Sequence, residues 1–199
     1  HIILAIDRAG IVGEDGETHQ GIYDVAYLST IPNVKIYSPY SFDELETCLK
    51  NAIYKDNCVV AVRYPKGAPK DVDKEYYSNS LTYSLFEQNQ SDNDNLIITY
   101  GRVFAECSYA VKEFNGKADI LKLTELAIDD KVLDIISRYK NVVFVEESIQ
   151  RGSLSENLGY ILVKSAFNGK YIAHTLGNCF IAHQTVAEAF KEYKMDKDG

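Results

Sequence analysis

Short apolar runs alternate with amphipathic stretches along this chain. The run Ile2–Ile6 is continuous, rich in β-branched residues and too short for a helix, which predicts a strand buried on both faces of a mainly parallel sheet. Residues 41–54 place apolar side chains at helical spacing behind Ser41, with Glu44 three residues later, so we expect an amphipathic helix with a capping box. Residues 58–62 form a further β-branched run and predict a second strand.

From residue 96 onward the pattern becomes a regular alternation of strand and helix. Strands are predicted at 96–100, 119–123, 142–146 and 171–176, and helices at 103–114, 131–139, 154–167 and 186–193. Strands that are each followed by a helix form a compact α/β domain, in which parallel pairing is the default. The polar tract before them, which includes the run 88–94, predicts an interdomain linker with room for one short strand at 81–86.

Composition narrows the classes of function. At 199 residues the chain has room for one large domain, or for a small domain and part of another. The net charge of −8, without a basic cluster, argues against nucleic acid as a partner. No apolar stretch approaches the roughly 20 residues that span a bilayer, so we expect no membrane partner. The 4 cysteines are widely spaced and form no Cys-x-x-Cys pair, which argues against a zinc or redox site and favours the cytoplasm.

The loop after the first predicted strand carries the main candidate chemistry. It holds Arg8, Asp15 and His19, which supply a cation, a carboxylate and a titratable group. Its glycines, which let a backbone turn sharply or approach a ligand closely, are Gly10, Gly13, Gly16 and Gly21. Loops at the carboxyl ends of parallel strands are where α/β proteins bind ligands, which favours an active-site rim. A solvated turn explains the same composition equally well.

Three segments of the first half point to one family. They are residues 7–24, the run Ile-Pro-Asn-Val at 31–34, and the run Ala-Val-Arg-Tyr-Pro-Lys-Gly at 61–67. In this order they resemble the 1-deoxy-D-xylulose-5-phosphate synthases, which are thiamine-diphosphate enzymes of the transketolase superfamily. Transketolases share the Gly-Glu-Asp-Gly-x-Thr-His-Gln core, but the Asp-Arg-Ala-Gly and Arg-Tyr-Pro flanks favour the synthase branch. The resemblance is close over roughly the first seventy residues and loose over the remainder.

The resemblance implies the domain organisation of an α/β chain. Residues 1–68 would be the C-terminal part of a pyrimidine-binding transketolase-like domain, 69–94 a linker, and 95–199 a transketolase C-terminal-like domain with a mainly parallel sheet. The family's Gly-Asp-Gly motif for metal and diphosphate, and the Glu that activates the cofactor, are not visible in this sequence. We therefore expect the C-terminal portion of a longer protein, a homodimer by analogy, and no metal site, cofactor binding or activity in the isolated chain.

The resemblance also implies roles for five side chains. His19 would lie beside the reacting carbon and Asp15 would accept a hydrogen bond from a hydroxyl group of the acceptor, so both are expected to be catalytic. Arg8, Arg63 and Lys66 would bind substrate carboxylate or phosphate. The family usually has arginine at the position of Lys66, so we expect a looser acceptor site. The alternatives are a strand-end salt bridge for Arg63 and an exposed loop lysine for Lys66.

The implied reaction joins pyruvate to glyceraldehyde 3-phosphate. Pyruvate loses CO2, and the product is 1-deoxy-D-xylulose 5-phosphate, which feeds isoprenoid, thiamine and pyridoxal synthesis. The whole protein would use thiamine diphosphate and Mg²⁺. Two alternatives stay open. One is a transketolase or a pyruvate dehydrogenase beta-like subunit with another acceptor, and the other is a non-catalytic interaction module.

The second half departs from the family's motifs at residues 124–129 and 146–152. Glu146 and Glu147 resemble a paired-carboxylate acid/base site, but they end a predicted buried strand, and we expect an interface or capping role for them. His174 and His183 lie on or near the last strand and helix, where a structural role is expected.

Overall fold

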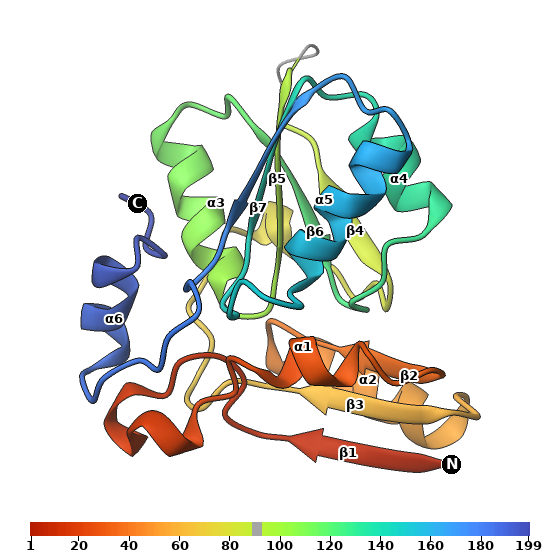
Figure 1. The fold of residues 1–199 in the computed structure, drawn as a ribbon, viewed down its shortest axis with the longest axis vertical. Helices are drawn as coiled ribbons and strands as arrows, with labels where there is room; N and C mark the ends of the chain where they lie inside the picture. The colour runs from red at the N-terminus through yellow and green to blue at the C-terminus, as the bar shows by residue number, and fades with distance from the viewer. Residues whose placement is uncertain (89–92) are drawn as a thin grey trace.

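The chain forms two lobes in the computed structural model, which describes residues 1–88 and 93–199 (Figure 1). The first lobe contains a three-stranded sheet in the order β1-β3-β2, and the second a five-stranded sheet in the order β4-β6-β5-β7-β8. All pairs are parallel except β4 with β6. The predicted α/β class with a mainly parallel sheet is therefore confirmed.

The first lobe is a small parallel sheet with short helices. Its elements are β1 (Ile2–Ile6), α1 (Asp24–Leu28), β2 (Val34–Tyr37), α2 (Phe42–Tyr54) and β3 (Val59–Arg63), with 3-10 turns at Gly13–Asp15 and Glu17–His19. The strands predicted at 2–6 and 58–62 are confirmed. The prediction that the first strand is buried on both faces is wrong, since Ile2 is 57% and Leu4 37% exposed. The reason is that, among the residues that the structure describes, β1 lies at the edge of the sheet and has one neighbour, β3.

Helix α2 confirms the predicted N-cap but not the whole capping box. The Ser41 hydroxyl accepts a hydrogen bond from the Glu44 amide at 3.2 Å. The Glu44 carboxylate does not return to Ser41, because it accepts from the Tyr40 amide at 2.8 Å and from the ammonium group of Lys122. Lys122 lies on β6, so this buried ion pair joins the two lobes. Burial lowers the pKa of Lys122 to about 7.

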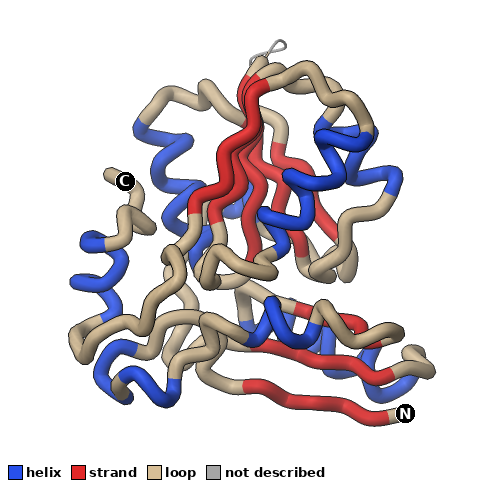
Figure 2. Tube along the Cα trace, viewed as in Figure 1, coloured by secondary structure: helices blue, strands red, loops and turns tan. Residues whose placement is uncertain are grey.

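The second lobe is a sheet with helices on both sides. Its elements are β4 (Tyr83–Phe86), β5 (Asn95–Tyr100), α3 (Val103–Glu113), β6 (Asp119–Leu123), α4 (Asp130–Ile136), β7 (Asn141–Val145), α5 (Leu154–Lys164), β8 (Lys170–His174) and α6 (Val186–Glu192). Figures 1 and 2 show α3 on one side of the sheet and α4 and α5 on the other. The four predicted strand-helix pairs are confirmed.

Strand β4 lies inside the segment that the sequence predicts as a linker. It pairs antiparallel with β6, so this part of residues 69–94 belongs to the second sheet. A 3-10 turn at Lys74–Tyr76 precedes it. Part of the polar run 88–94, residues 89–92, lies outside the described residues. The division of the chain at residues 68 and 94 stays a prediction.

The two lobes meet through main-chain bonds as well as the buried ion pair. The Ser38 amide donates to the Thr124 carbonyl, and the Leu126 amide donates to the Ile36 carbonyl, both at 2.8 Å. Ile36 and Ala61 of the first lobe share one apolar cluster with strands β5, β6 and β7. The carboxyl end of β2 is thereby fixed against the segment that follows β6. None of the helices in the part of the chain that the structure describes has the length and hydropathy of a membrane span.

Candidate functional site

A cluster of three charges lies where β1 and β3 end. The two strands are parallel neighbours, so their carboxyl ends meet at one edge of the sheet. There the Arg8 Nε donates to Asp15 Oδ2 at 2.8 Å, and the Lys66 Nζ donates to Asp15 Oδ1 at 2.6 Å. Arg8 also pairs with Asp7. The structure thus brings together three of the predicted site residues in what we call the Arg8–Asp15–Lys66 cluster.

Solvent reaches both cations of this cluster. The side chain of Lys66 is 51% exposed and that of Arg8 37%, whereas that of Asp15 is 20% exposed. Hydrogen bonds from Lys66, and then from Arg8, lower the pKa of Asp15 to about 2, so this carboxyl group is ionised at neutral pH. Ion pairs at exposed positions are weak. Arg8 and Lys66 can therefore exchange Asp15 for an incoming anion at little cost.

The backbone beside the cluster adopts a strained conformation at Arg8. Its φ of 60° lies in the left-handed region, which is uncommon for residues other than glycine. Two main-chain bonds hold it there: Gly21 donates to the Arg8 carbonyl, and Ala9 donates to the Tyr64 carbonyl, both at 3.0 Å. Strain of this kind persists only where the surroundings fix it, and it is concentrated at functional sites.

His19 lies outside the contacts of the cluster. It ends the second 3-10 turn and is exposed to solvent. Its Nδ1 is 2.9 Å from the Thr18 hydroxyl oxygen. An exposed imidazole on the same loop remains accessible to a substrate, and its catalytic role stays a prediction.

Arg63 is buried and its guanidinium group binds within the chain. Its side chain is 2% exposed. The Nε donates to Asp24 Oδ2 at 3.2 Å, and Nη2 donates to the Gly21 carbonyl at 2.7 Å. The strand-end salt bridge considered from the sequence is therefore present, with Asp24 of helix α1 as a partner that the sequence analysis did not identify. Substrate binding by Arg63 stays a prediction.

Two of the loop glycines allow a close approach to the second lobe. A Cβ on Gly10 would lie 2.3 Å from the carboxyl carbon of Glu147, and one on Gly13 would lie 2.2 Å from the Gln184 carbonyl oxygen. Both glycines also have positive φ. The sequence attributes them to sharp turns or to ligand approach; the sharp turns are confirmed, and at these two positions the close neighbour is the protein itself.

Glu146 and Glu147 follow β7 and have the two roles expected for them. Glu146 accepts a hydrogen bond from the Tyr100 hydroxyl at 2.6 Å and from the Ser155 amide in the first turn of α5 at 2.7 Å, which makes it a helix cap. Glu147 accepts from the Ile11 amide at 2.6 Å and pairs with Arg102, which makes it an interface residue. Sequence reasoning missed Arg102, because its partner is 45 residues away.

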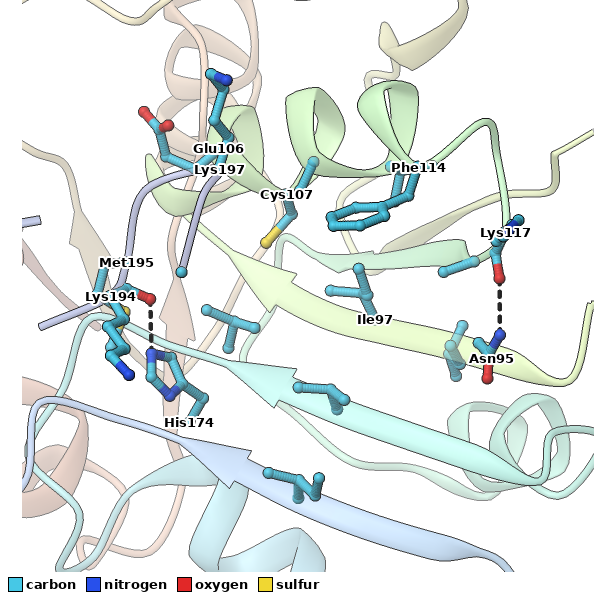
Figure 3. Close-up of a pocket in the computed structure, with 18 of the residues that line it drawn as sticks. Asn95, Ile97, Glu106, Cys107, Phe114, Lys117, His174, Lys194, Met195 and Lys197 are labelled. Carbon is cyan, nitrogen blue, oxygen red and sulfur yellow. Dashed lines mark hydrogen bonds between the residues drawn. The ribbon is translucent and has the colours of Figure 1, made fainter. Parts of the chain in front are cut away.

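Neither histidine of the second lobe joins the site. His174 Nε2 lies 2.8 Å from the Lys194 carbonyl oxygen, and His183 is exposed on the segment before α6. His174 lines an apolar groove of about 480 Å³ on the second sheet, between α3 and the C-terminal segment (Figure 3). The groove is lined by none of the five predicted site residues.

The described residues contain no group of three or more His, Cys, Asp or Glu side chains that could hold a metal ion. This part of the chain therefore lacks a ligand set for a magnesium ion.

Comparison with known proteins gives the same family as the sequence motifs. Residues 1–70 match the family "Transketolase, pyrimidine binding domain". The 1-deoxy-D-xylulose-5-phosphate synthase of Clostridium perfringens is 35% identical over 189 residues, covering 87% of this chain and 30% of that protein. The synthase of Phocaeicola vulgatus is 30% identical, covering 100% of this chain and 32% of that protein. The chain thus spans about a third of the length of these curated relatives.

Solved structures match the fold of the chain. A structure described as "Split gene transketolase, inactive beta4 tetramer" has a TM-score of 0.80 at 20% identity, covering 98% of this chain and 63% of that chain. The transketolase of Campylobacter jejuni has a TM-score of 0.70 at 15% identity, covering 98% of this chain and 30% of that chain. The chain has the transketolase-like α/β fold, and over most of its length its sequence is similar to about a third of a 1-deoxy-D-xylulose-5-phosphate synthase.

Proposed function

We propose that this chain is part of a thiamine-diphosphate-dependent transferase that condenses pyruvate with glyceraldehyde 3-phosphate to 1-deoxy-D-xylulose 5-phosphate and CO2. The identity of 35% to a synthase over most of the chain supports this reaction. The bound cofactor would supply an electron sink that stabilises the carbanion formed when pyruvate loses CO2. The cofactor and Mg²⁺ would be held by residues outside this chain, in a parent protein proposed to be a homodimer.

The Arg8–Asp15–Lys66 cluster is the observation that carries the proposal. It places two exposed cations 2.8 Å and 2.6 Å from one carboxylate, at the carboxyl edge of a parallel sheet. Ligands of α/β proteins bind at this edge. A phosphate group of the acceptor would replace Asp15 as the partner of Arg8 and Lys66. Asp15 would then accept a hydrogen bond from a hydroxyl group of the acceptor.

His19 would handle the proton at the reacting centre. Its imidazole is exposed on the same loop, four residues after Asp15, and an imidazole group can accept a proton and, once protonated, return it. In the proposed reaction it would donate a hydrogen bond to the pyruvate carboxylate or to the alkoxide that forms on the acceptor.

For Arg63 we favour a positioning role over direct contact with substrate. Its guanidinium group binds the Gly21 carbonyl and the Asp24 carboxylate, where the loop ends and helix α1 begins. Gly21 in turn donates to the carbonyl of Arg8. Arg63 would thus act on the cluster through the backbone of Arg8.

The experiment that tests this function is an assay of the full-length protein with pyruvate, thiamine diphosphate and Mg²⁺. Product formation would be compared with glyceraldehyde 3-phosphate, with ribose 5-phosphate and with no acceptor. We expect 1-deoxy-D-xylulose 5-phosphate to form when glyceraldehyde 3-phosphate is the acceptor, and not in the other two assays. Ketol transfer from a sugar donor would instead favour a transketolase, and no turnover with any acceptor would favour a non-catalytic module.

A further inference from the structure

Two charged residues of the second lobe bind the backbone of the loop that carries the cluster. Glu147 Oε1 accepts a hydrogen bond from the Ile11 amide at 2.6 Å, and the Arg102 guanidinium group donates to the Ile11 carbonyl. Arg102 and Glu147 also pair with each other. The backbone amide and carbonyl of Ile11 are therefore both bound by one ion pair. We call Arg102, Glu147 and their bonds to Ile11 the Ile11 clamp.

The surroundings of the clamp leave it little freedom. Ile11 is fully buried and Glu147 is 6% exposed. The Arg102 guanidinium carbon lies 5.2 Å from the centre of the Phe190 ring on α6. Gly10 leaves no space beside the carboxylate, since a Cβ there would lie 2.3 Å from its carbon. The clamp is thus packed on several sides, as precise positioning requires.

The same turn after β7 also holds the other end of the loop. The Ser148 hydroxyl and the Ile149 amide both donate to the Ile22 carbonyl at 3.0 Å. Residues 147–149 therefore bind the chain at Ile11 and at Ile22, while the cluster residues Arg8 and Asp15 lie within four residues of Ile11. The second lobe therefore binds the loop on both sides of Asp15, at Ile11 and at Ile22.

We propose that Glu147 and Arg102 are positioning residues that hold Arg8 and Asp15 in register with Lys66, so that the cluster can bind a phosphate group. This inference rests on the proposed function for the identity of the ligand, an aldose phosphate. That Glu147 and Arg102 fix the conformation of the loop is inferred independently of the proposed function. Loss of the Glu147 charge removes the partner of Arg102 and frees the Ile11 clamp to open, while the cluster side chains themselves stay unchanged.

The first test measures hydrogen exchange in the full-length protein and its Glu147→Gln variant. We expect exchange in residues 7–21 to become about tenfold faster or more, because local opening sets the rate there. Glu146→Gln is the matched control: Glu146 is a buried glutamate one residue away that bonds to Tyr100 and Ser155 instead of the loop. Unchanged exchange in residues 7–21 of Glu147→Gln, or equal acceleration in the control, would overturn the proposal.

A double variant asks whether the two residues act as one unit. If they do, Glu147→Gln combined with Arg102→Gln accelerates exchange in residues 7–21 no more than about twofold beyond Glu147→Gln alone, because residues of one network are not additive. Glu147→Asp, which keeps the charge, should restore part of the protection. Fully additive effects of the two changes would contradict a shared clamp.

The second test separates positioning from a general loss of stability. Glu147→Gln should raise the KM for glyceraldehyde 3-phosphate about tenfold and change kcat less, and it should weaken inhibition by inorganic phosphate by a similar factor. A fall in kcat with unchanged KM and unchanged phosphate inhibition would overturn the proposal. If the full-length protein shows no turnover at all, the proposed function fails, and hydrogen exchange still decides whether the clamp controls the loop.

Discussion

The charged groups that follow β1 and β3 differ from those that follow β7. In the Arg8–Asp15–Lys66 cluster, two cations share one carboxylate and remain 37% and 51% exposed. After β7, Glu146 is fully buried and Glu147 is 6% exposed, and each binds partners within the chain. Both groups follow parallel strands, and both looked like candidate chemistry in the sequence. The two groups differ in exposure and in the number of bonds already made, which favours ligand binding at the first group and a structural role at the second.

The physical reason is the cost of separating charges. An exposed ion pair contributes about 0–1 kcal/mol, so a phosphate group can replace one member of it. A buried carboxylate that loses its partner costs several kcal/mol, so its bonds persist in the folded protein. The first group can therefore take part in a binding equilibrium, whereas the second fixes one conformation. The following changes test this distinction.

The largest effect is expected from loss of the exposed imidazole group of His19. His19→Ala in the full-length protein should lower kcat about 10²- to 10⁴-fold, the usual contribution of a general acid or base, without loss of thermal stability. His183→Ala is the control, because it removes another exposed imidazole that lies outside the loop. The measurement is steady-state turnover beside a melting curve. Turnover within threefold of wild type in the His19 variant would remove this residue from the site.

Removing a buried charge should act on stability instead. Arg63→Met would leave Asp24 without its guanidinium partner and the Gly21 carbonyl without a donor. We expect a loss of about 3–5 kcal/mol in the free energy of unfolding, measured by urea denaturation. Lys66→Met removes an exposed cation and should cost less than about 1 kcal/mol. Equal losses in the two variants would break the comparison between buried and exposed charges.

The capping carboxylate should show a smaller effect on stability. Glu146→Gln weakens the acceptor for the Tyr100 hydroxyl and the Ser155 amide, so we expect a loss of about 1–3 kcal/mol. The KM for glyceraldehyde 3-phosphate should stay unchanged, because Glu146 does not bind the loop. A raised KM without a loss of stability would show that Glu146 belongs to the site.

Lys66, which stands where the resemblance leads us to expect arginine, offers a finer test. Lys66→Arg restores a planar group that can bind phosphate through two parallel bonds, so the KM for glyceraldehyde 3-phosphate should fall about two- to tenfold. Arg8 supplies the second cation in both forms. A higher KM in the Lys66→Arg variant would contradict the looser acceptor site expected from lysine.

The smallest effect concerns the titration of Asp15. Its pKa of about 2 lies below the ordinary 3.8, because Lys66 and Arg8 donate to it. The stabilisation from these bonds is complete above about pH 3.8 and is lost as the pH falls through about 2. Carboxyl carbon NMR would follow the titration, and Lys66→Met should move the midpoint upward. A midpoint near 4 in the unchanged protein would show that the cluster does not form in solution.

The sequence predicted most strands and helices because the signals are local. Apolar periodicity located four strand-helix pairs in the second lobe, and Ser41 marked the start of α2. The β1 strand was also predicted, but its exposure was not, because a five-residue apolar run does not show how many neighbours it has. The capping box at Glu44 failed for a similar reason, since its competitor Lys122 is 78 residues away.

In the candidate site, too, the residues of local motifs could be predicted and the long-range contacts could not. Arg8 and Asp15 could be identified because both belong to one motif, and Lys66 because it belongs to a second motif that follows a neighbouring strand. The burial of Arg63 depends on Asp24, and the Ile11 clamp depends on Arg102 and Glu147, which lie 91 and 136 residues from Ile11. Such long-range pairings have no local pattern, so only the folded structure reveals them.

The most direct test of the account is a comparison of two acceptors in the full-length protein and its Lys66→Ala variant. The KM is measured for glyceraldehyde 3-phosphate and for glyceraldehyde, which lacks the phosphate group. If the Arg8–Asp15–Lys66 cluster binds the phosphate, the variant raises the KM for the phosphorylated acceptor about tenfold and leaves that for glyceraldehyde within twofold. Equal changes for both acceptors, or no change for either, would contradict the assignment of the cluster as the phosphate site.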